Sequence, residues 1–291
     1  MSAHIKEPTV TIIIPAYNEA ASLRACLDSC LLQTTMPDEI LVIDNNSTDD
    51  TYAIAEEYRQ KHPKLIKLLK QPKQGLIPTR DFGFDQAKSE VLGRIDADSR
   101  LEPEWVAALK DIFKDNTIMA ATGPSYFYDS PPSFKKIASD IHRFITHHIN
   151  ERIAGHKMLW GSNMALRKSA WQTIKPHTCS VKDIIEDLDL AIHCAEAGLK
   201  MHFDERLMNS ISPRRYLSSP KGIYSYLQMW PRTYEIHDRK KSARMARAAV
   251  PVVLAGTYVP TNLGLRGYDP VANRFSIKKF IGHVPNKRGN P

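Results

Sequence analysis

The chain has 291 residues, of which 42% are hydrophobic and 25% are charged. These are ordinary values for a folded globular protein, and they exclude a disordered chain, a fibrous repeat and a small disulfide scaffold. Lys and Arg exceed Asp and Glu by 40 to 32, and the excess lies in residues 238–291, which hold eleven basic and two acidic residues. Residues 1–237 are nearly neutral, which disfavours a general nucleic-acid binder because such a protein needs a basic face on its fold.

Strand and helix patterns alternate along the first 125 residues. Short apolar runs rich in β-branched residues predict five buried strands, at Val10–Ile14, Glu39–Asp44, Leu65–Leu69, Val91–Asp96 and Ile118–Thr122. Apolar residues at helical spacing predict helices at Glu19–Gln33, Asp50–Lys61, Thr79–Lys88 and Pro103–Lys114. Repeated strand–helix units predict an α/β fold with a parallel, doubly wound sheet, whose ligands bind beyond the carboxyl ends of the strands.

The pattern is less regular after residue 125. We expect helices at Phe134–Arg152, Asp183–Ala197 and Pro220–His237 (interrupted at Pro231), a strand and loop over Lys157–Leu166, and a strand at Lys200–Asp204. The remaining tail is expected to be irregular and basic. Its uncharged run Ala248–Leu265 contains prolines and glycines that a lone spanning helix tolerates badly, so we expect no transmembrane segment.

The four cysteines indicate a reducing compartment, and the N-terminus shows no apolar signal region. The expected location is therefore the cytoplasm. Cys26 and Cys30 lie one turn apart on a predicted helix. Core packing is favoured over a metal pair for them, because no Cys or His partners follow at zinc spacing.

Carboxylates follow two of the predicted strands. Asp96 and Asp98 follow the fourth strand, and two carboxylates with substrate phosphates are typical ligands of Mg²⁺. A solvated acidic turn is the alternative, but the position after a buried strand favours the metal site. Asp44 ends the second strand, too far upstream to cap the next helix as Ser47 or Asp49 can. It is placed to accept hydrogen bonds from a nucleobase or a ribose.

Three further segments carry candidate chemistry. Tyr17, within Pro15–Glu19, can present its ring to a base, although an ordinary strand-to-helix turn explains the segment equally well. Arg80 can neutralise phosphate charge, or it is a surface arginine on a helix. Acids gather near the first turn of the predicted helix at 183–197, where the macrodipole favours them, and one of them can act as a general base toward a hydroxyl. These acids are Glu186, Asp187 and Asp189.

These segments, in this order, resemble the family 2 glycosyltransferases of the GT-A fold. The family patterns are P-x-Y-N-E, V-x-D-[DN]-x-S-x-D-x-T, G-x-x-x-A-R-N-x-G, D-x-D, G-[ST]-N-x-x-[FL]-R and E-D-x-D-L-x-x-R-x-x-x-x-G. The chain matches them at Pro15–Glu19, Val42–Thr51, Gly75–Gly83, Asp96–Asp98, Gly161–Arg167 and Glu186–Gly198. The resemblance covers about residues 8–215, and Ser212–Arg215 is a further family-like element.

The resemblance implies an inverting enzyme with a nucleoside-diphosphate sugar donor and a divalent metal, Mg²⁺ or Mn²⁺. By position, the donor nucleotide would be held by Pro15, Tyr17, Glu19, Asp44, Arg80 and Asp96. Asp98, with Asp96, would ligate the metal, and Asp187 would be the catalytic base. The acceptor side would be lined by Trp160, Gly161, Ser162, Asn163 and Glu186. UDP is the favoured donor nucleotide because Tyr17 and Asp44 resemble residues that contact uracil.

The chain departs from the family pattern at several positions. Thr79 replaces the usual Ala and Asp81 the usual Asn on either side of Arg80, and His193 stands where the family often has Arg. The segment Gln228–Arg232 is only faintly similar to the Q-x-x-R-W signature of processive synthases, so transfer of a single sugar is expected. His237 is either a third metal ligand or a surface histidine, and the second is favoured.

The sequence thus predicts a GT-A protein in three parts: a nucleotide-sugar-binding half with the D-x-D motif (1–125), an acceptor-binding and catalytic-base half (126–237) and a basic extension (238–291). The expected function is transfer of one sugar to a hydroxyl acceptor, such as a lipid-linked or cell-envelope glycan. The basic extension suggests peripheral binding to an anionic membrane on its inner face. The alternative is a GT-A-like nucleotide-sugar-binding module or an envelope-assembly subunit without transferase activity.

Overall fold

The computed structural model describes residues 6–130, 140, 144–269 and 272–282. Its contacts divide the chain into two compact units. The first, here called the sheet unit, comprises Met1–Pro124, Leu159–Ser180 and Glu186–Ser210. The second, here called the helical unit, comprises Ser125–Met158, Val181–Ile185 and Ile211–Pro291. The division into donor, acceptor and tail parts expected from the sequence stays a prediction.

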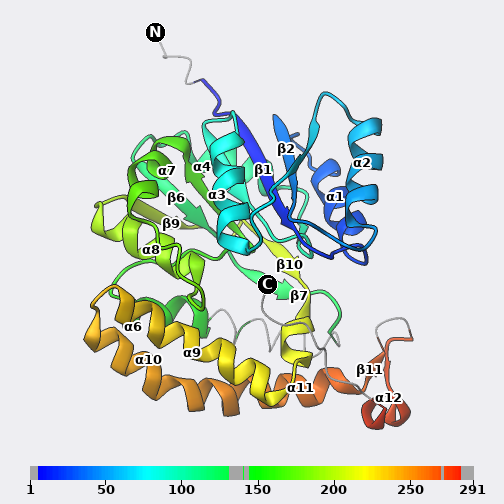
Figure 1. Cartoon of the computed structure of the whole chain (residues 1–291), viewed down its shortest axis with the longest axis vertical. Helices are drawn as coiled ribbons and strands as arrows, with labels where there is room; N and C mark the ends of the chain where they lie inside the picture. The colour runs from blue at the N-terminus through cyan, green and yellow to red at the C-terminus, as the bar shows by residue number, and fades with distance from the viewer. Residues whose placement is uncertain (1–5, 131–139, 141–143, 270–271, 283–291) are drawn as a thin grey trace. The chain divides into compact units, whose positions relative to one another are not determined.

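A seven-stranded sheet forms the centre of the sheet unit, with the order β3-β2-β1-β4-β8-β6-β9. Its strands are β1 (Val10–Ala16), β2 (Glu39–Asp44), β3 (Ile66–Lys70), β4 (Val91–Arg94), β6 (Ile118–Thr122), β8 (Met164–Arg167) and β9 (Lys200–Phe203). Figure 1 shows β1 and β2 side by side, and their pairing is parallel. The sheet is rich in parallel pairs, as expected, and β8 runs antiparallel to both β4 and β6.

Helices cover both faces of this sheet. They are α1 (Leu23–Leu31), α2 (Thr51–Lys61), α3 (Leu76–Gln86), α4 (Trp105–Ile112), α7 (Lys168–Ile174) and α8 (Glu186–Glu196), with a 3₁₀ turn at Lys175–His177. One apolar cluster joins the sheet to α1, α2 and α4, and a second joins it to α3, α7 and α8. Burial on both faces explains why the parallel strands are almost continuously apolar.

Most predicted elements of the sheet unit are confirmed, with shifted ends. The first helix begins at Leu23 rather than Glu19, and α3 begins three residues early, directly after Gly75. Gly75 has a φ of 131°, a conformation that favours glycine. A short strand β5 (Arg100–Leu101) pairs antiparallel with β10 (Asn209–Ile211) through Asn209 and Ser210. Neither strand was predicted, because each is too short to show an alternating pattern.

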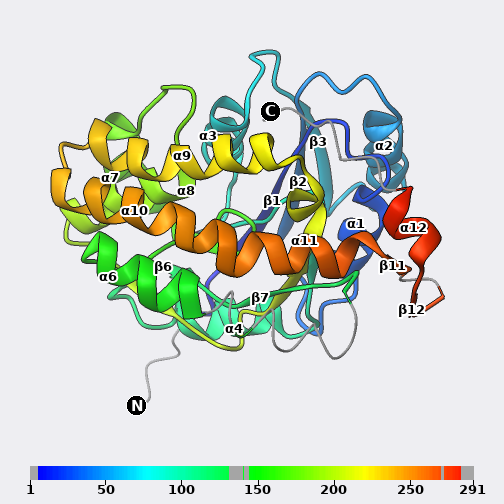
Figure 2. The ribbon, with the colours of Figure 1, turned by 90° about the horizontal axis from the view of Figure 1, so that it is seen from below.

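The helical unit is built mainly from α9 (Pro220–Ile236) and α10 (Lys240–Val253), which Figures 1 and 2 show running alongside one another. Its other elements are β7 (Ser125–Phe127), a π-helix at Phe144–Ile149, α6 (Asn150–Ala154), a 3₁₀ turn at Pro213–Leu217, a π-helix at Leu254–Tyr258, α11 (Val259–Arg266), β11 (Tyr268–Asp269), β12 (Arg274–Phe275) and α12 (Ile277–Ile281). Much of the predicted helix at 134–152 lies outside the described residues.

Two expectations for this part of the chain are wrong. Pro231 lies inside α9 without interrupting it, and the tail is helical rather than irregular. Helix α10, the π-helix and α11 form one rod over Lys240–Arg266, visible in Figure 2. This 27-residue rod is long and apolar enough to cross a membrane, by length and composition only, and 22% of its most apolar window is buried. The prolines that argued against a spanning helix lie within this rod, Pro251 inside α10 and Pro260 in the first turn of α11.

Candidate active site

The loops that follow β1 and β2 are tied together by hydrogen bonds. The amide of Asn18 donates to Ser47 Oγ at 3.1 Å, the amide of Thr48 donates to Asn18 Oδ1 at 2.8 Å, and the amide of Glu19 donates to Thr51 Oγ1 at 2.7 Å. Asn18 has a φ of 52°, which asparagine tolerates better than most residues. The two predicted donor-binding turns therefore form one rigid edge of the sheet.

The predicted base-binding residues lie at this edge. Tyr17 is 38% exposed, as a ring that receives a ligand must be. Asp44 is 4% exposed, and its Oδ1 accepts a long hydrogen bond (3.4 Å) from the amide of Ser47. Pro15 and Ala16 belong to β1 and pair with Ile43 and Asp44 of β2. The donor roles of Pro15, Tyr17, Glu19 and Asp44 stay predictions.

Asn45 organises the loop that leads into α3. Its buried side chain donates to the carbonyls of Gln71 (2.7 Å) and Lys73 (2.9 Å) and accepts from the amide of Gly75 (2.8 Å). Asn45 is not among the site residues predicted from the sequence. Its position was a usable signal, because an asparagine directly after a strand end, here beside Asp44, can hydrogen-bond to neighbouring backbone groups.

Asp96 and Asp98 lie just beyond the end of β4, as predicted, and both are partly exposed. The Asp96 carbonyl accepts from the amide of Ser99 at 2.9 Å, which closes the turn that carries both carboxylates. A pair of carboxylates at a turn is a donor set of hard oxygen atoms, which suits Mg²⁺ or Mn²⁺. The residues present therefore fit the metal that the motif implies.

Arg94, which was not predicted from the sequence, connects two parts of the candidate site. It is completely buried, and its guanidinium donates to Asp96 Oδ1 at 2.8 Å and to Glu186 Oε1 at 2.7 Å. The sequence did contain a signal for Arg94, because a charged residue within an otherwise apolar, buried strand normally has a partner. It links the carboxylate turn after β4 to the first turn of α8.

The carboxylate of Asp187 is fixed by two backbone amides. Gly161 donates to Oδ2 and Leu188 donates to Oδ1, each at 2.8 Å. Asp187 is the second residue of α8, where the positive end of the helix dipole favours a negative charge. Each oxygen keeps a second acceptor position, so these hydrogen bonds orient the carboxylate without preventing it from accepting a proton.

The two neighbouring acids of α8 have opposite pKa shifts. Burial raises the pKa of Asp187 to about 7, and repulsion from Glu186 acts in the same direction. Burial also acts to raise the pKa of Glu186, but attraction to Arg94 and Arg80 outweighs it and holds that pKa below its ordinary value. A pair of acids whose pKa values are driven apart is the pattern expected when one must exchange a proton near neutral pH.

Arg80 is fully buried, so it is not a surface arginine on α3. It donates to Asp81 Oδ1 at 2.7 and 2.9 Å and to the carbonyl of Glu186 at 2.9 Å. The acid at position 81, where the family pattern has Asn, therefore neutralises the arginine beside it. Burial raises the pKa of Asp81, although Arg80 opposes the shift. The donor-binding role of Arg80 stays a prediction, and in the structure it supports the first turn of α8.

The segment Trp160–Asn163 lies against the same network. A Cβ added to Gly161 would fall 1.7 Å from Arg94 Nη1, so only glycine leaves room for the guanidinium. Asn163 is fully buried: its Oδ1 accepts from Trp105 Nε1 (2.8 Å), and its Nδ2 donates to the carbonyls of Pro124 (3.1 Å) and Leu207 (2.7 Å). Acceptor contacts of Trp160, Gly161, Ser162, Asn163 and Glu186 stay predictions. The structure gives Gly161, Asn163 and Glu186 supporting roles.

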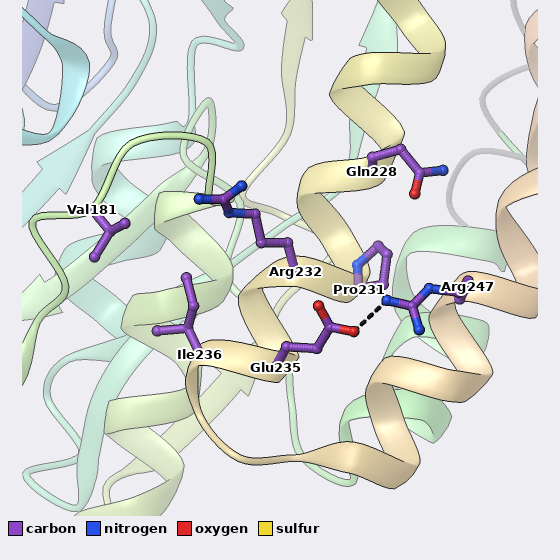
Figure 3. Close-up of a pocket in the computed structure, with 7 residues that line it drawn as sticks. All are labelled: Val181, Gln228, Pro231, Arg232, Glu235, Ile236 and Arg247. Carbon is purple, nitrogen blue, oxygen red and sulfur yellow. Dashed lines mark hydrogen bonds and ion pairs between the residues drawn. The ribbon is translucent and has the colours of Figure 1, made fainter.

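A separate pocket lies within the helical unit, shown in Figure 3. It is lined by Val181, Gln228, Pro231, Arg232, Glu235, Ile236 and Arg247. Arg247 forms an ion pair with Glu235 across it. Gln228 and Arg232, from the segment faintly similar to the processive signature, both line this pocket, whereas Trp230 between them is buried. His237 follows the last turn of α9, and its role as a metal ligand stays a prediction.

Solved structures share this fold. A mannosyltransferase from Pyrobaculum calidifontis, solved in complex with GDP-Man and Mn²⁺, superposes with a TM-score of 0.65 at 18% identity, over 94% of this chain and 78% of that one. Residues 1–349 of S. aureus TarS, solved with UDP-GlcNAc, superpose with a TM-score of 0.60 at 16% identity, over 91% of this chain and 81% of that one. At such identities the likeness shows the GT-A fold.

Sequence comparison reaches the family. The chain is 33% identical to a hyaluronan synthase of Pasteurella multocida over 118 residues (40% of this chain, 12% of that protein). It is 34% identical to the glycosyltransferase AglE of Haloferax volcanii over 101 residues (34% of this chain, 33% of that protein). These matches span a third or less of either relative. The profile described as "Glycosyl transferase family 2" matches residues 11–174, more than half of the chain, and one described as "Glycosyl transferase family group 2" matches residues 94–259. The chain therefore belongs to the family 2 glycosyltransferases and has their GT-A fold.

Proposed function

We propose that this glycosyltransferase moves one sugar from a nucleoside-diphosphate sugar to a hydroxyl group of an acceptor, with inversion at the anomeric carbon. The observation that carries the proposal is the state of Asp187. It is a carboxylate oriented by two amides, with a pKa of about 7, and Arg94 joins the acid before it, Glu186, to Asp96. A single positioned base suffices for inversion, because the acceptor oxygen attacks directly as it loses its proton.

Each residue has a defined part in this scheme. Asp187 takes the proton of the acceptor hydroxyl onto a carboxylate oxygen. Glu186 stays ionised beside Arg94 and raises the basicity of Asp187 by repulsion. Asp96 and Asp98 would hold Mg²⁺ or Mn²⁺, which, when bound, supplies positive charge that stabilises the departing nucleoside diphosphate. Tyr17 and Asp44 would bind the base and Arg80 would lie near the base or diphosphate.

A thermal-shift panel tests the donor site. UDP, GDP, dTDP and CMP are each added with and without Mn²⁺ to wild type, to Asp98→Asn and to the control Asp111→Asn, which removes an exposed carboxylate on α4. We expect UDP to raise the melting temperature of wild type and the control only when Mn²⁺ is present, since a ligand that binds the native state stabilises it by mass action. No shift with any nucleotide would contradict the proposal. A shift with GDP alone would correct the base, which is a real alternative because the solved neighbours carry GDP-Man and UDP-GlcNAc.

Donor hydrolysis separates an enzyme from a binding module. We expect slow release of UDP from UDP-sugars by wild type and much less from Asp187→Asn. Proton NMR of the first sugar released from an α-linked donor should show the β anomer, as inversion requires. Metal-dependent binding without any hydrolysis or transfer would favour the alternative, a GT-A-like nucleotide-sugar-binding module or envelope-assembly subunit.

We further propose that the rod Lys240–Arg266 binds an anionic membrane, so that the acceptor is a lipid-linked or envelope glycan and the protein is peripheral on the cytoplasmic face. Its first two turns carry Lys240, Lys241 and Arg244, and large apolar side chains are exposed farther along, such as Val252 (69%) and Leu263 (47%). Cationic and apolar residues on one exposed helix suit an anionic lipid surface.

Co-sedimentation with vesicles tests this part. We expect wild type to bind vesicles that contain phosphatidylserine more strongly than neutral phosphatidylcholine vesicles. A triple variant with Gln at 240, 241 and 244 should lose that preference, and a control with Gln at the exposed lysines 61, 114 and 200 should keep it. Equal binding to both vesicles by all three proteins would contradict the proposal. Adding a nucleic acid as competitor tests whether the basic tail binds nucleic acid instead, which is the less favoured alternative.

A further inference from the structure

A second group of potential metal ligands lies outside the donor site. Cys179, Asp189 and His193 each offer one ligand atom, and these atoms lie within 4.8 Å of one another. All three residues belong to the sheet unit, with Asp189 and His193 one turn apart on α8 and Cys179 in the segment after α7. We propose that this cluster binds a transition-metal ion, with Zn²⁺ as the preferred ion. The proposed glycosyl transfer has no use for these three side chains.

The distances suit such an ion. Asp189 Oδ1 lies 3.4 Å from His193 Nε2, and Asp189 Oδ2 accepts from the amide of Cys179 at 3.2 Å. Zinc bonds of 2.0–2.3 Å in a tetrahedron place ligand atoms about 3.3–3.8 Å apart, so the most distant pair must close by about 1 Å. A tetrahedral site takes one further ligand beside these three.

The surroundings of His193 resemble those of a metal ligand. Its Nδ1 lies 3.4 Å from Glu196 Oε2, opposite the nitrogen that faces Asp189. A carboxylate at one ring nitrogen orients a histidine and directs the other nitrogen toward a metal. His193 stands where the family often has Arg, and this departure fits a metal ligand. Arginine at position 193 could pair with Asp189 but could not bind a metal ion.

Charge and burial favour a soft divalent ion over Mg²⁺. Asp189 is fully buried, whereas Cys179 is half-buried and leaves a path for entry. On binding, the thiol of Cys179 gives its proton to solvent as the sulfur–zinc bond forms, so two anionic ligands neutralise the ion. Sulfur and imidazole ligands select zinc-like ions, whereas Mg²⁺ requires oxygen.

Cobalt spectroscopy tests the site without any activity measurement. The full-length protein with Asp98→Asn, which weakens the predicted catalytic metal site, is stripped with a chelator and titrated with Co²⁺ under reducing conditions. We expect one equivalent to produce a thiolate-to-cobalt charge-transfer band, which Zn²⁺ then abolishes by displacement. The double variant Asp98→Asn with Cys179→Ser should show no band and should bind Zn²⁺ at least about 100-fold more weakly. This loss is larger than that caused by removing a residue that only hydrogen-bonds to a metal ligand.

Two further variants make the result decisive. His193→Arg keeps a cationic partner for Asp189 and so should stay folded, as circular dichroism will verify, yet it should also remove the band. Cys30→Ala, in the core on another helix, should keep it. The proposal is overturned if no band forms, or if the band survives both Cys179→Ser and His193→Arg. Loss of the band in Cys30→Ala alone would also overturn it, by placing the ion at Cys26 and Cys30.

Discussion

The backbone amide of Gly161 donates a 2.8 Å hydrogen bond to Oδ2 of Asp187, so the segment just before β8 fixes the orientation of the carboxylate at the start of α8. The same glycine leaves room for Arg94, whose guanidinium holds Glu186, the residue before Asp187. The orientation of the proposed base and the ionisation of its neighbour Glu186 therefore depend in part on residues distant in sequence. Each of these contacts can be altered singly.

The pH dependence of kcat/KM should report the ionisation of Asp187. Its pKa is raised to about 7 by burial and by Glu186, and the proposed base must be ionised to accept a proton. We therefore expect kcat/KM to rise about tenfold per pH unit below pH 7 and to level off above it. Initial rates of UDP release between pH 5.5 and 9, at fixed Mn²⁺, measure this profile.

The Asp187→Asn variant should lose about 10²–10⁴-fold in kcat/KM, the usual contribution of a general base, and keep metal-dependent donor binding. Asp183→Asn is the control, because Asp183 is exposed and has a φ of 62° that asparagine also adopts. A wild-type profile that is flat across pH 7, or an Asp187→Asn enzyme as active as the control, would remove Asp187 from its proposed role.

Replacing Arg94 with Met should destabilise the fold at neutral pH. The change leaves Glu186 buried without its cation, and breaking such a buried pair costs about 3–5 kcal/mol of unfolding free energy. Arg94 lowers the pKa of Glu186, so this stabilisation is present above the unfolded pKa of 4.5 and is lost as the pH falls through the lower folded value. Urea unfolding at pH 7.5 and pH 4 should therefore show a larger difference from wild type at pH 7.5.

The double variant Arg94→Met with Glu186→Gln should recover much of the lost stability, because both charges are then absent. Arg206→Met is the matched control. Arg206 also pairs with two carboxylates, Asp204 and Asp111, but it is 54% exposed, so its loss should change stability by no more than about 1 kcal/mol. Equal losses for Arg94→Met and Arg206→Met would show that burial of the Arg94 network is energetically unimportant.

Gly161→Ala should disable the site and also lower the stability of the fold, because it disturbs the buried Arg94–Glu186 pair. The new methyl group would fall 1.7 Å from Arg94 Nη1 and 3.0 Å from Glu186 Oε1, so the guanidinium must move away from the acid beside the proposed base. We expect kcat to fall by at least about tenfold, since small displacements in a catalytic site cost up to about 10²-fold. Steady-state kinetics and a melting curve measure both effects. Gly256→Ala, where an added Cβ meets nothing within 4 Å, should leave both unchanged.

The sequence was sufficient for the elements whose signal is local. Apolar runs predicted the strands β1 and β2 correctly. Motif spacing predicted the positions of the carboxylates after β4 and of the acids in the first turn of α8. It was insufficient where the outcome depends on partners distant in the chain. The antiparallel insertion of β8 between β4 and β6 left no trace in the pattern of Met164–Arg167, because a strand buried on both faces looks the same in either direction.

The site residues divide in the same way. Asp187 was identified by its motif, which also contains Glu186, but the raised pKa of Asp187 depends first on burial, which no motif encodes. Arg94 was missed because an arginine within a strand acquires meaning only when its partners are known. The helical tail was misjudged because prolines were weighed as helix breakers, whereas Pro251 lies inside α10 and Pro260 lies in the first turn of α11.

Asn163→Ala separates a supporting role from the predicted acceptor contact. The change removes the partner of Trp105 Nε1 and of the carbonyls of Pro124 and Leu207, and each buried polar group left without a partner costs about 1–3 kcal/mol. We expect the free energy of unfolding to fall by at least about 3 kcal/mol in urea titrations. Asn116→Ala, on the exposed turn before β6, should change it by less than about 0.5 kcal/mol. If Asn163 instead acts by binding acceptor, its loss will raise the KM for acceptor while stability stays at the wild-type value.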